Sequence, residues 1–116
     1  MRISSLRLPE VREVGNDFTS YCTSLVSMEL PKLERVGNYF AYCCKSLVSL
    51  ELPELKEAGD DFVTHCRSLA NLSLPKLEKA GDWFTYRCTS LHNLTLPKLE
   101  KAGPWFALNC PLLQKR

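Results

Sequence analysis

Apolar and polar residues repeat along this chain with a period of 22 residues, and the stretch 72–91, LSLPKLEKAGDWFTYRCTSL, shows the repeating unit. Leu72 and Leu74 flank a polar residue, and this alternation predicts a short strand with both leucines facing a core. Pro75 marks the end of that strand because proline has no N–H group to donate to a neighbouring strand. The unit therefore opens with a half-buried strand.

The second half of the unit predicts a corner and a return. Leu77 and Ala80 continue the inward set, and Gly81 indicates a position where the chain turns tightly or takes a positive φ angle. Phe84 and Cys88 follow at a spacing of four residues, which favours one or two turns of α or 3₁₀ helix.

The key residues stay in register through the whole chain. All five glycines share one position of the repeat, and all five phenylalanines share another. The members are Gly15, Gly37, Gly59, Gly81 and Gly103, and Phe18, Phe40, Phe62, Phe84 and Phe106. A period in the range of roughly 20–50 residues is the signature of stacked repeats, each too small to bury its own apolar side chains. The sequence predicts one solenoid domain over residues 1–116, with about five coils.

The consensus LxLPxLxxxGxxFxxxCxSLxx resembles the leucine-rich repeats of the BspA-like type, in the LP strand end, the Gly-x-x-Phe step and the Cys-x-Ser-Leu return. The resemblance covers nearly all of the chain. It implies a right-handed, curved leucine-rich repeat solenoid, with short parallel strands on one face and a short second strand and turn or helical segments on the other. It also implies use in adhesion or recognition at a cell surface. One departure is the residue before each Phe, where the family often has Ala and this chain has Asp17, Tyr39, Asp61, Trp83 and Trp105.

Charge and hydropathy narrow the choice of partner. The net charge is only +2, with 15 basic and 13 acidic residues interspersed, so no strong field attracts nucleic acid. No apolar run approaches the ~20 residues that cross a bilayer, so membrane insertion is not expected. The first residues lack the ~7–15-residue apolar region of a secretory signal. We therefore expect an intracellular protein, or a cell-surface or secreted one if the chain is a domain of a longer protein.

The cysteines raise the question of disulfides. Five are in register, at Cys22, Cys44, Cys66, Cys88 and Cys110. Stacked neighbours satisfy the Cα separation of a disulfide, roughly 4.4–6.8 Å, but their Cβ vectors are nearly parallel. We therefore expect buried, reduced thiols that act as small hydrophobic groups. Cys43 shares an outward column with His65; zinc usually takes four ligands, so we expect a surface pair and no metal or cofactor.

Aromatic residues outside the phenylalanine column form two further columns. Tyr39, Trp83 and Trp105 share one, and Tyr42 and Tyr86 share another three positions on. Tyrosine and tryptophan are enriched at binding hot spots, so these rings are candidate contact residues. The same rings could instead fold back over the phenylalanines and thicken the core. The sequence leaves both interpretations open.

The outward side of the predicted strands is polar, and faces of this kind in solenoids often bind extended ligands. Its candidate contact residues are Arg7, Glu29, Glu51, Asn71, Ser73, Asn93 and Thr95. No phosphate-binding loop or catalytic set of residues occurs, because each glycine stands alone and like residues stack in rows.

The sequence thus predicts a non-enzymatic module for protein recognition or adhesion that binds a protein partner through the strand face and the aromatic edge. The alternative is a structural subunit that stacks end to end or docks into a larger complex. Ile3 already matches Leu25 in the repeat, so the N-terminal edge is expected to be uncapped and open to a second copy of the chain.

Overall fold

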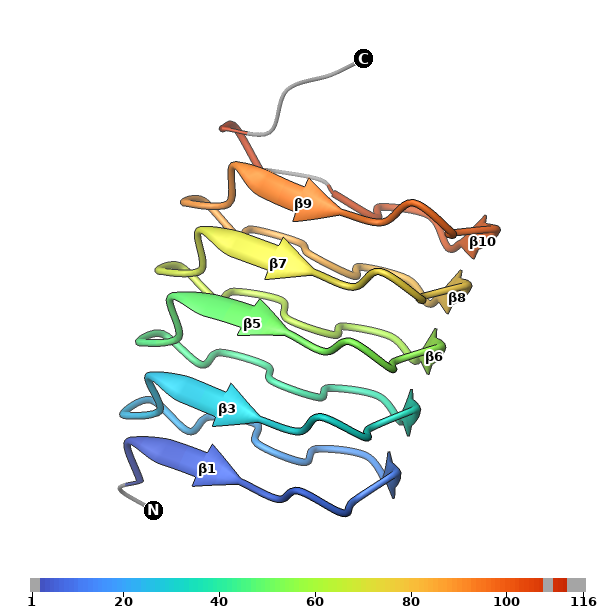
Figure 1. The fold of residues 1–116 in the computed structure, drawn as a ribbon. Coiled ribbons are helices and arrows are strands. Elements are labelled where there is room, and N and C mark those ends of the chain that lie inside the picture. Colours follow the sequence, from blue (N-terminus) through green and yellow to red (C-terminus); the bar gives the residue numbers. More distant parts are fainter. Residues whose placement is uncertain (1–2, 108–109, 113–116) are drawn as a thin grey trace.

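The chain winds into a solenoid of short parallel strands in a computed structural model that describes residues 3–107 and 110–112 (Figure 1). Three-residue strands stack on one side, and we call them the front strands: β1 (Ser5–Arg7), β3 (Ser27–Glu29), β5 (Ser49–Glu51), β7 (Asn71–Ser73) and β9 (Asn93–Thr95). Two-residue side strands stack at one edge: β2 (Glu13–Val14), β4 (Arg35–Val36), β6 (Glu57–Ala58), β8 (Lys79–Ala80) and β10 (Lys101–Ala102).

Each front strand continues into a side strand, and a return segment of turns then leads back to the next front strand (Figure 1). We number these levels 1 to 5 from β1 to β9. Paired residues lie 22 positions apart, as in Leu50 with Leu72 and Ala58 with Ala80. The predicted solenoid, with parallel front strands and a short second strand, is confirmed.

The two sets of strands differ in continuity. The side strands form one parallel sheet in the order β10-β8-β6-β4-β2, whereas the front strands divide into β1-β3 and β5-β7-β9. The division falls where Glu29 and Glu51 occupy the same column on neighbouring levels. Like charges on adjacent strands repel, so this contact is unfavourable, although Lys79 and Lys101 show that strands can pair with like charges in register.

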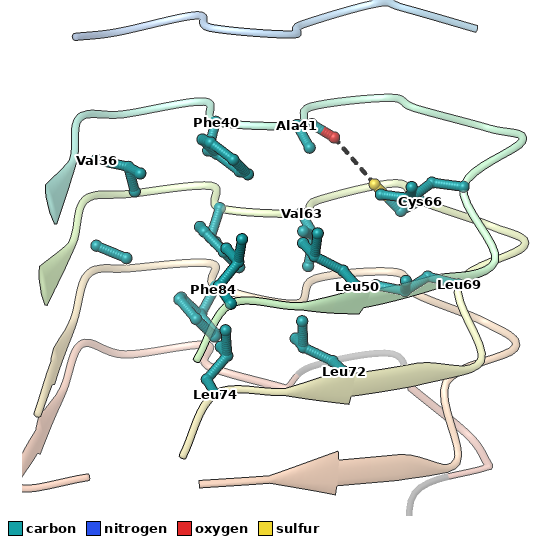
Figure 2. Close-up of a cluster of buried hydrophobic side chains, with 14 of the residues drawn as sticks. Val36, Phe40, Ala41, Leu50, Val63, Cys66, Leu69, Leu72, Leu74 and Phe84 are labelled. Atoms are coloured by element: carbon teal, nitrogen blue, oxygen red, sulfur yellow. Dashed lines mark hydrogen bonds between the residues drawn. The ribbon is translucent and has the colours of Figure 1, made fainter. Parts of the chain in front are cut away.

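The core lies between the front strands and the return segments. Leu50 and Leu72 of the front strands share one buried cluster with Val63 and Phe84 of the return segments (Figure 2). Phe62 stacks on Phe84 with ring centroids 4.6 Å apart and an interplanar angle of 5°. The phenylalanine column is therefore a continuous row of stacked rings inside the solenoid.

The return segments contain turns and, among the described residues, no helix, so the predicted helical turns are wrong. Their backbone N–H groups bond to the next level. The N–H of Ala41 donates to the carbonyl of Phe62 at 2.8 Å, and that of Val63 donates to Phe84 at 3.0 Å. A helix would need these same donors for bonds along its own axis, so the stacking of levels replaces it.

The glycines serve close approach and not left-handed backbone, because no glycine has a positive φ angle. A Cβ atom on Gly59 would lie 2.9 Å from the carbonyl carbon and oxygen of Gly37 on the level before, and closer still to the side-chain oxygen of Asn38. That oxygen accepts a hydrogen bond from the backbone N–H of Asp60 at 2.8 Å. Glycine therefore lets successive levels approach at this corner.

The cysteine column is buried, as predicted, at Cys44, Cys66 and Cys88, whereas Cys22 is half-buried. Each buried thiol donates to a carbonyl oxygen 25 residues earlier, as Cys66 does to Ala41 at 2.9 Å (Figure 2). Burial raises the pKa of Cys44 to about 11 and that of Cys88 to about 12. These thiols therefore stay protonated and unreactive at neutral pH.

Candidate functional site: an aromatic strip

Aromatic side chains outside the core touch one another along the return segments from level 1 to level 5. We call this row the aromatic strip, and it consists of Tyr21, Tyr39, Tyr42, His65, Trp83, Tyr86 and Trp105.

The first half of the strip is a series of edge-to-face contacts. Ring centroids are 5.4 Å apart for Tyr21 and Tyr42, 5.8 Å for Tyr42 and His65, and 5.7 Å for His65 and Tyr86. Edge-to-face pairs at these distances are favourable because the positive edge of one ring meets the negative face of the other. His65 therefore links rings that lie two levels apart.

The second half ends in the tryptophans. Trp83 meets Tyr86 edge to face at 4.9 Å and stacks on Trp105 at 5.5 Å. Tyr39 meets Tyr42 at 5.3 Å in the same way. The guanidinium carbon of Arg87 lies 5.6 Å above the ring of Tyr86, within the range of a cation–π contact.

These rings lie outside the cluster of buried side chains that forms the core. The exposed fractions of Tyr21, Tyr39 and Trp105 are 65%, 39% and 53%, whereas that of Phe62 is 0%. The other rings of the strip are half-buried. The strip is therefore a partly exposed surface of contiguous rings.

Five of the seven rings, those of Tyr21, Tyr39, His65, Trp83 and Trp105, stand on backbone that disfavours them. Tyr39, Trp83 and Trp105 have φ angles of 58°, 57° and 62°, in the left-handed region. This conformation costs an ordinary L-residue roughly 1–2 kcal/mol, and aspartate, found at the same position as Asp17 and Asp61, tolerates it better. Large rings are therefore present here in spite of the backbone, which is typical of functional sites.

Ring and carboxylate levels alternate along the strip. At levels 2 and 4 the two ring columns hold an aromatic pair, and at levels 1 and 3 they hold an aspartate that accepts a hydrogen bond from a hydroxyl group. The hydrogen-bonded pairs are Asp17 with Ser20 and Asp61 with Thr64, both at 3.0 Å. Level 3 therefore places a carboxylate between the ring pairs of levels 2 and 4.

Burial shifts the titration of the groups at level 3. Burial raises the pKa of Asp61, while the hydrogen bond from Thr64 acts in the opposite direction. Burial also lowers the pKa of His65, and the positive charges of Arg87 and Arg67 lower it further. His65 is therefore neutral at pH 7, and its ring is available for packing.

The predicted residues of the strand face lie on the front strands, where all are exposed except the half-buried Ser73. Arg7 pairs with Glu29 at 3.1 Å, and the side-chain amide of Asn93 donates to the oxygen of Asn71 at 2.6 Å. The core separates this face from the return segments that carry the strip (Figure 1). The two predicted surfaces are therefore distinct faces of the molecule.

The aromatic edge predicted from the sequence does not include Tyr21 and His65, whereas Arg87 stands among the outward residues that the repeat leaves unexplained. His65 was paired with Cys43 as a surface neighbour, but its ring contacts Tyr42 and Tyr86 instead. The signal was available, because their column directly follows the Tyr42 and Tyr86 column. Among the described residues, no group of three His, Cys, Asp or Glu side chains could hold a metal ion.

The comparisons with known proteins agree with this geometry. The family model of the BspA type leucine-rich repeat region matches residues 2–114 with six copies. Comparison with curated proteins and with solved structures gives no significant match. Within residues 3–107 and 110–112, no helix is long and apolar enough to cross a membrane. The chain belongs to the family of BspA type leucine-rich repeat proteins.

Proposed function

We propose that this protein is a recognition module for adhesion that binds a protein partner through the aromatic strip. The contiguous row of partly exposed rings from Tyr21 to Trp105 carries the proposal. Rigid aromatic side chains supply large contact areas at a small cost in conformational entropy, so they dominate many binding surfaces.

Two further observations support this assignment. Leucine-rich repeats of this family generally serve protein interaction and are typically non-enzymatic. The left-handed backbone of Tyr39, Trp83 and Trp105 favours smaller residues, so their rings serve something other than local backbone stability. The polar strand face is a second contact surface, suited to an extended segment of the same partner or of another one.

The experiment is site-specific photo-crosslinking in an extract of the source organism. A photoreactive phenylalanine analogue replaces Trp105, which is exposed and already aromatic, and a matched protein carries it at Lys79 on β8. We expect one protein to be crosslinked from position 105 and not from position 79. Equal labelling from the two positions, or none from position 105, would contradict the proposal.

A second function is favoured by the apolar residues at the two outermost levels. Leu8 and Phe18 at level 1, and Leu96 and Phe106 at level 5, remain half-buried, whereas their equivalents at level 3 are fully buried. A structural subunit would cover these residues by stacking end to end with a second copy or by docking into a larger complex. The two functions predict different responses to substitution.

The alternative predicts that light scattering detects an increase in mass with concentration. It also predicts that the double variant Trp83→Ala/Trp105→Ala keeps this assembly, because the strip lies along the side of the stack. A stable monomer at high concentration would reject the end-to-end subunit and leave lateral recognition.

A further inference from the structure

The carboxylate at level 3 has no cationic partner among the ion pairs of the described residues. Asp61 is half-buried, and its hydrogen-bond donor is the neutral hydroxyl of Thr64. Asp60 and Asp82 lie close enough to raise its pKa further by repulsion, while His65 acts in the opposite direction. A partly desolvated carboxylate among like charges is unfavourable alone and gains from a cation supplied by another molecule.

Aromatic residues flank this carboxylate on both sides. Tyr39 stands at the same position one level before Asp61, and Trp83 stands one level after. Positions two levels apart are separated by roughly 9–10 Å, twice the strand spacing. A cation within ~6 Å of each ring centroid can contact both rings, and the Arg87 guanidinium over Tyr86 shows that the strip already accepts such a group.

Deepening the proposed function, on which it rests, we infer that level 3 of the aromatic strip binds an arginine side chain of the partner protein. Asp61 accepts hydrogen bonds from the guanidinium group, and Tyr39 and Trp83 cover its faces. Arginine fits better than lysine because its planar fork pairs with a carboxylate in two bonds and also stacks on rings.

The charges around the site predict how binding depends on pH. Asp60 and Asp82 add negative charge beside Asp61, whereas Arg67 and Arg87 act on His65. Burial raises the pKa of Asp61, so as the pH falls its carboxylate loses its charge at a higher pH than an exposed aspartate would. Protonation of His65 at low pH adds a positive charge nearby. Both changes weaken binding of a guanidinium group, so affinity declines from pH 7.5 towards pH 5.

The test is an NMR titration of the full chain with the peptide acetyl-Gly-Arg-Gly-amide at pH 7.5. We expect saturable shifts of the Asp61 backbone amide and the Trp83 indole N–H. The same peptide with citrulline, the uncharged isostere of arginine, should bind at least about fivefold more weakly, as expected for a lost charge-assisted contact.

Two variants separate binding from folding. Asp61→Asn lowers arginine-peptide affinity about fivefold or more, while its melting temperature at pH 7 stays equal or rises, since asparagine suits the left-handed backbone and removes the desolvated charge. Asp17→Asn is the matched control. Asp17 accepts an equivalent hydrogen bond from the hydroxyl of Ser20 and has a similar φ angle of 59°, but a level with rings lies on only one side of it. It leaves the affinity unchanged within about twofold.

Absence of saturable shifts at level 3, equal affinity for the citrulline peptide, or full affinity of Asp61→Asn would each overturn the inference. The crosslinking result is independent of arginine. A partner captured at position 105 together with any of these outcomes removes the arginine site alone and keeps the recognition function.

Discussion

Trp83 occupies a backbone conformation that suits the aspartate found at the same position one level earlier. Its φ angle is 57° and that of Asp61 is 54°, so the two residues share one local geometry. The chain thus accepts either residue type at this position, and the choice between ring and carboxylate sets the surface. At the scale of single residues, the candidate contact groups are therefore side chains that the fold itself does not require.

Gly59 tests how closely the levels approach. We expect Gly59→Ala to lower the free energy of unfolding by about 1–3 kcal/mol, because the new Cβ would meet the Gly37 carbonyl at 2.9 Å. Urea denaturation measures the change. Gly15→Ala is the control, since a Cβ there has nothing within 4 Å, and it should be nearly neutral. Equal losses in both variants would refute the packing explanation.

The buried thiols make stability fall at alkaline pH. Unfolded cysteines ionise near pH 9, whereas burial raises the pKa of Cys88 to about 12 in the folded chain. The unfolded state therefore loses protons first, and stability present below pH 9 is lost between about pH 9 and 12, by up to ~1.4 kcal/mol per thiol and pH unit.

Thermal unfolding between pH 8 and pH 11 tests this thiol effect. Cys88→Ala should flatten the decline, although it lowers stability at every pH, and Cys43→Ala should change the slope little because that thiol is only half-buried. Identical slopes in the two variants and the parent chain would show that the column does not control the alkaline loss.

At the scale of the element, the return segments show the limit of reading spacing alone. Phe84 and Cys88 have helical spacing, yet the chain between them forms turns. Their positions fit because both side chains are buried, and the N–H of Thr85 between them donates to the Phe106 carbonyl of the next level at 2.9 Å. Such a bond depends on the neighbouring coil and is invisible within a single repeat.

The division of the front strands is a second feature of an element that can be tested. Glu51→Lys should raise the free energy of unfolding by about 0.2–1 kcal/mol, because a lysine beside Glu29 replaces a repulsive pair with an attractive one. Glu29→Lys is the contrasting variant: it also places a lysine beside Glu51, but it breaks the 3.1 Å pair with Arg7 and brings two cations together, so its net gain should be smaller. If chemical denaturation finds no gain in the unfolding free energy of Glu51→Lys, repulsion between Glu29 and Glu51 does not explain the division of the front strands.

The sequence predicted the solenoid, its inward columns and the thiol chemistry, because each of these follows from the period itself. It did not predict the aromatic strip as one surface, since the contacts of His65 join residues of three levels through rings whose directions depend on left-handed backbone. The glycine role was also misassigned. Close approach between levels leaves the same signal in a sequence as a positive φ angle does.

At the scale of the whole molecule, stacking gives two distinct surfaces from one repeat. The front strands present a polar row, and the return segments present the strip, with the core between them (Figure 1). Ring and carboxylate levels share one backbone geometry at the position of Asp61 and Trp83, where the φ angles are 54° and 57°. The outward side chains of one level can therefore be replaced by those of another level of the same protein.

The most direct measurement is the affinity of the crosslinked partner for the variant Trp83→Asp/Tyr86→Thr. These substitutions give level 4 the Asp61 and Thr64 pair of level 3, so the chain path should be kept. Loss of the ring contacts of Trp83 and Tyr86 should lower the unfolding free energy by about 0.5–1.5 kcal/mol per ring pair, so binding is measured well below the melting temperature of the variant. We expect at least about tenfold weaker binding by this variant, as for loss of a hot spot, and unchanged binding by Lys79→Ala. Full affinity of the exchanged level would contradict the assignment of the strip.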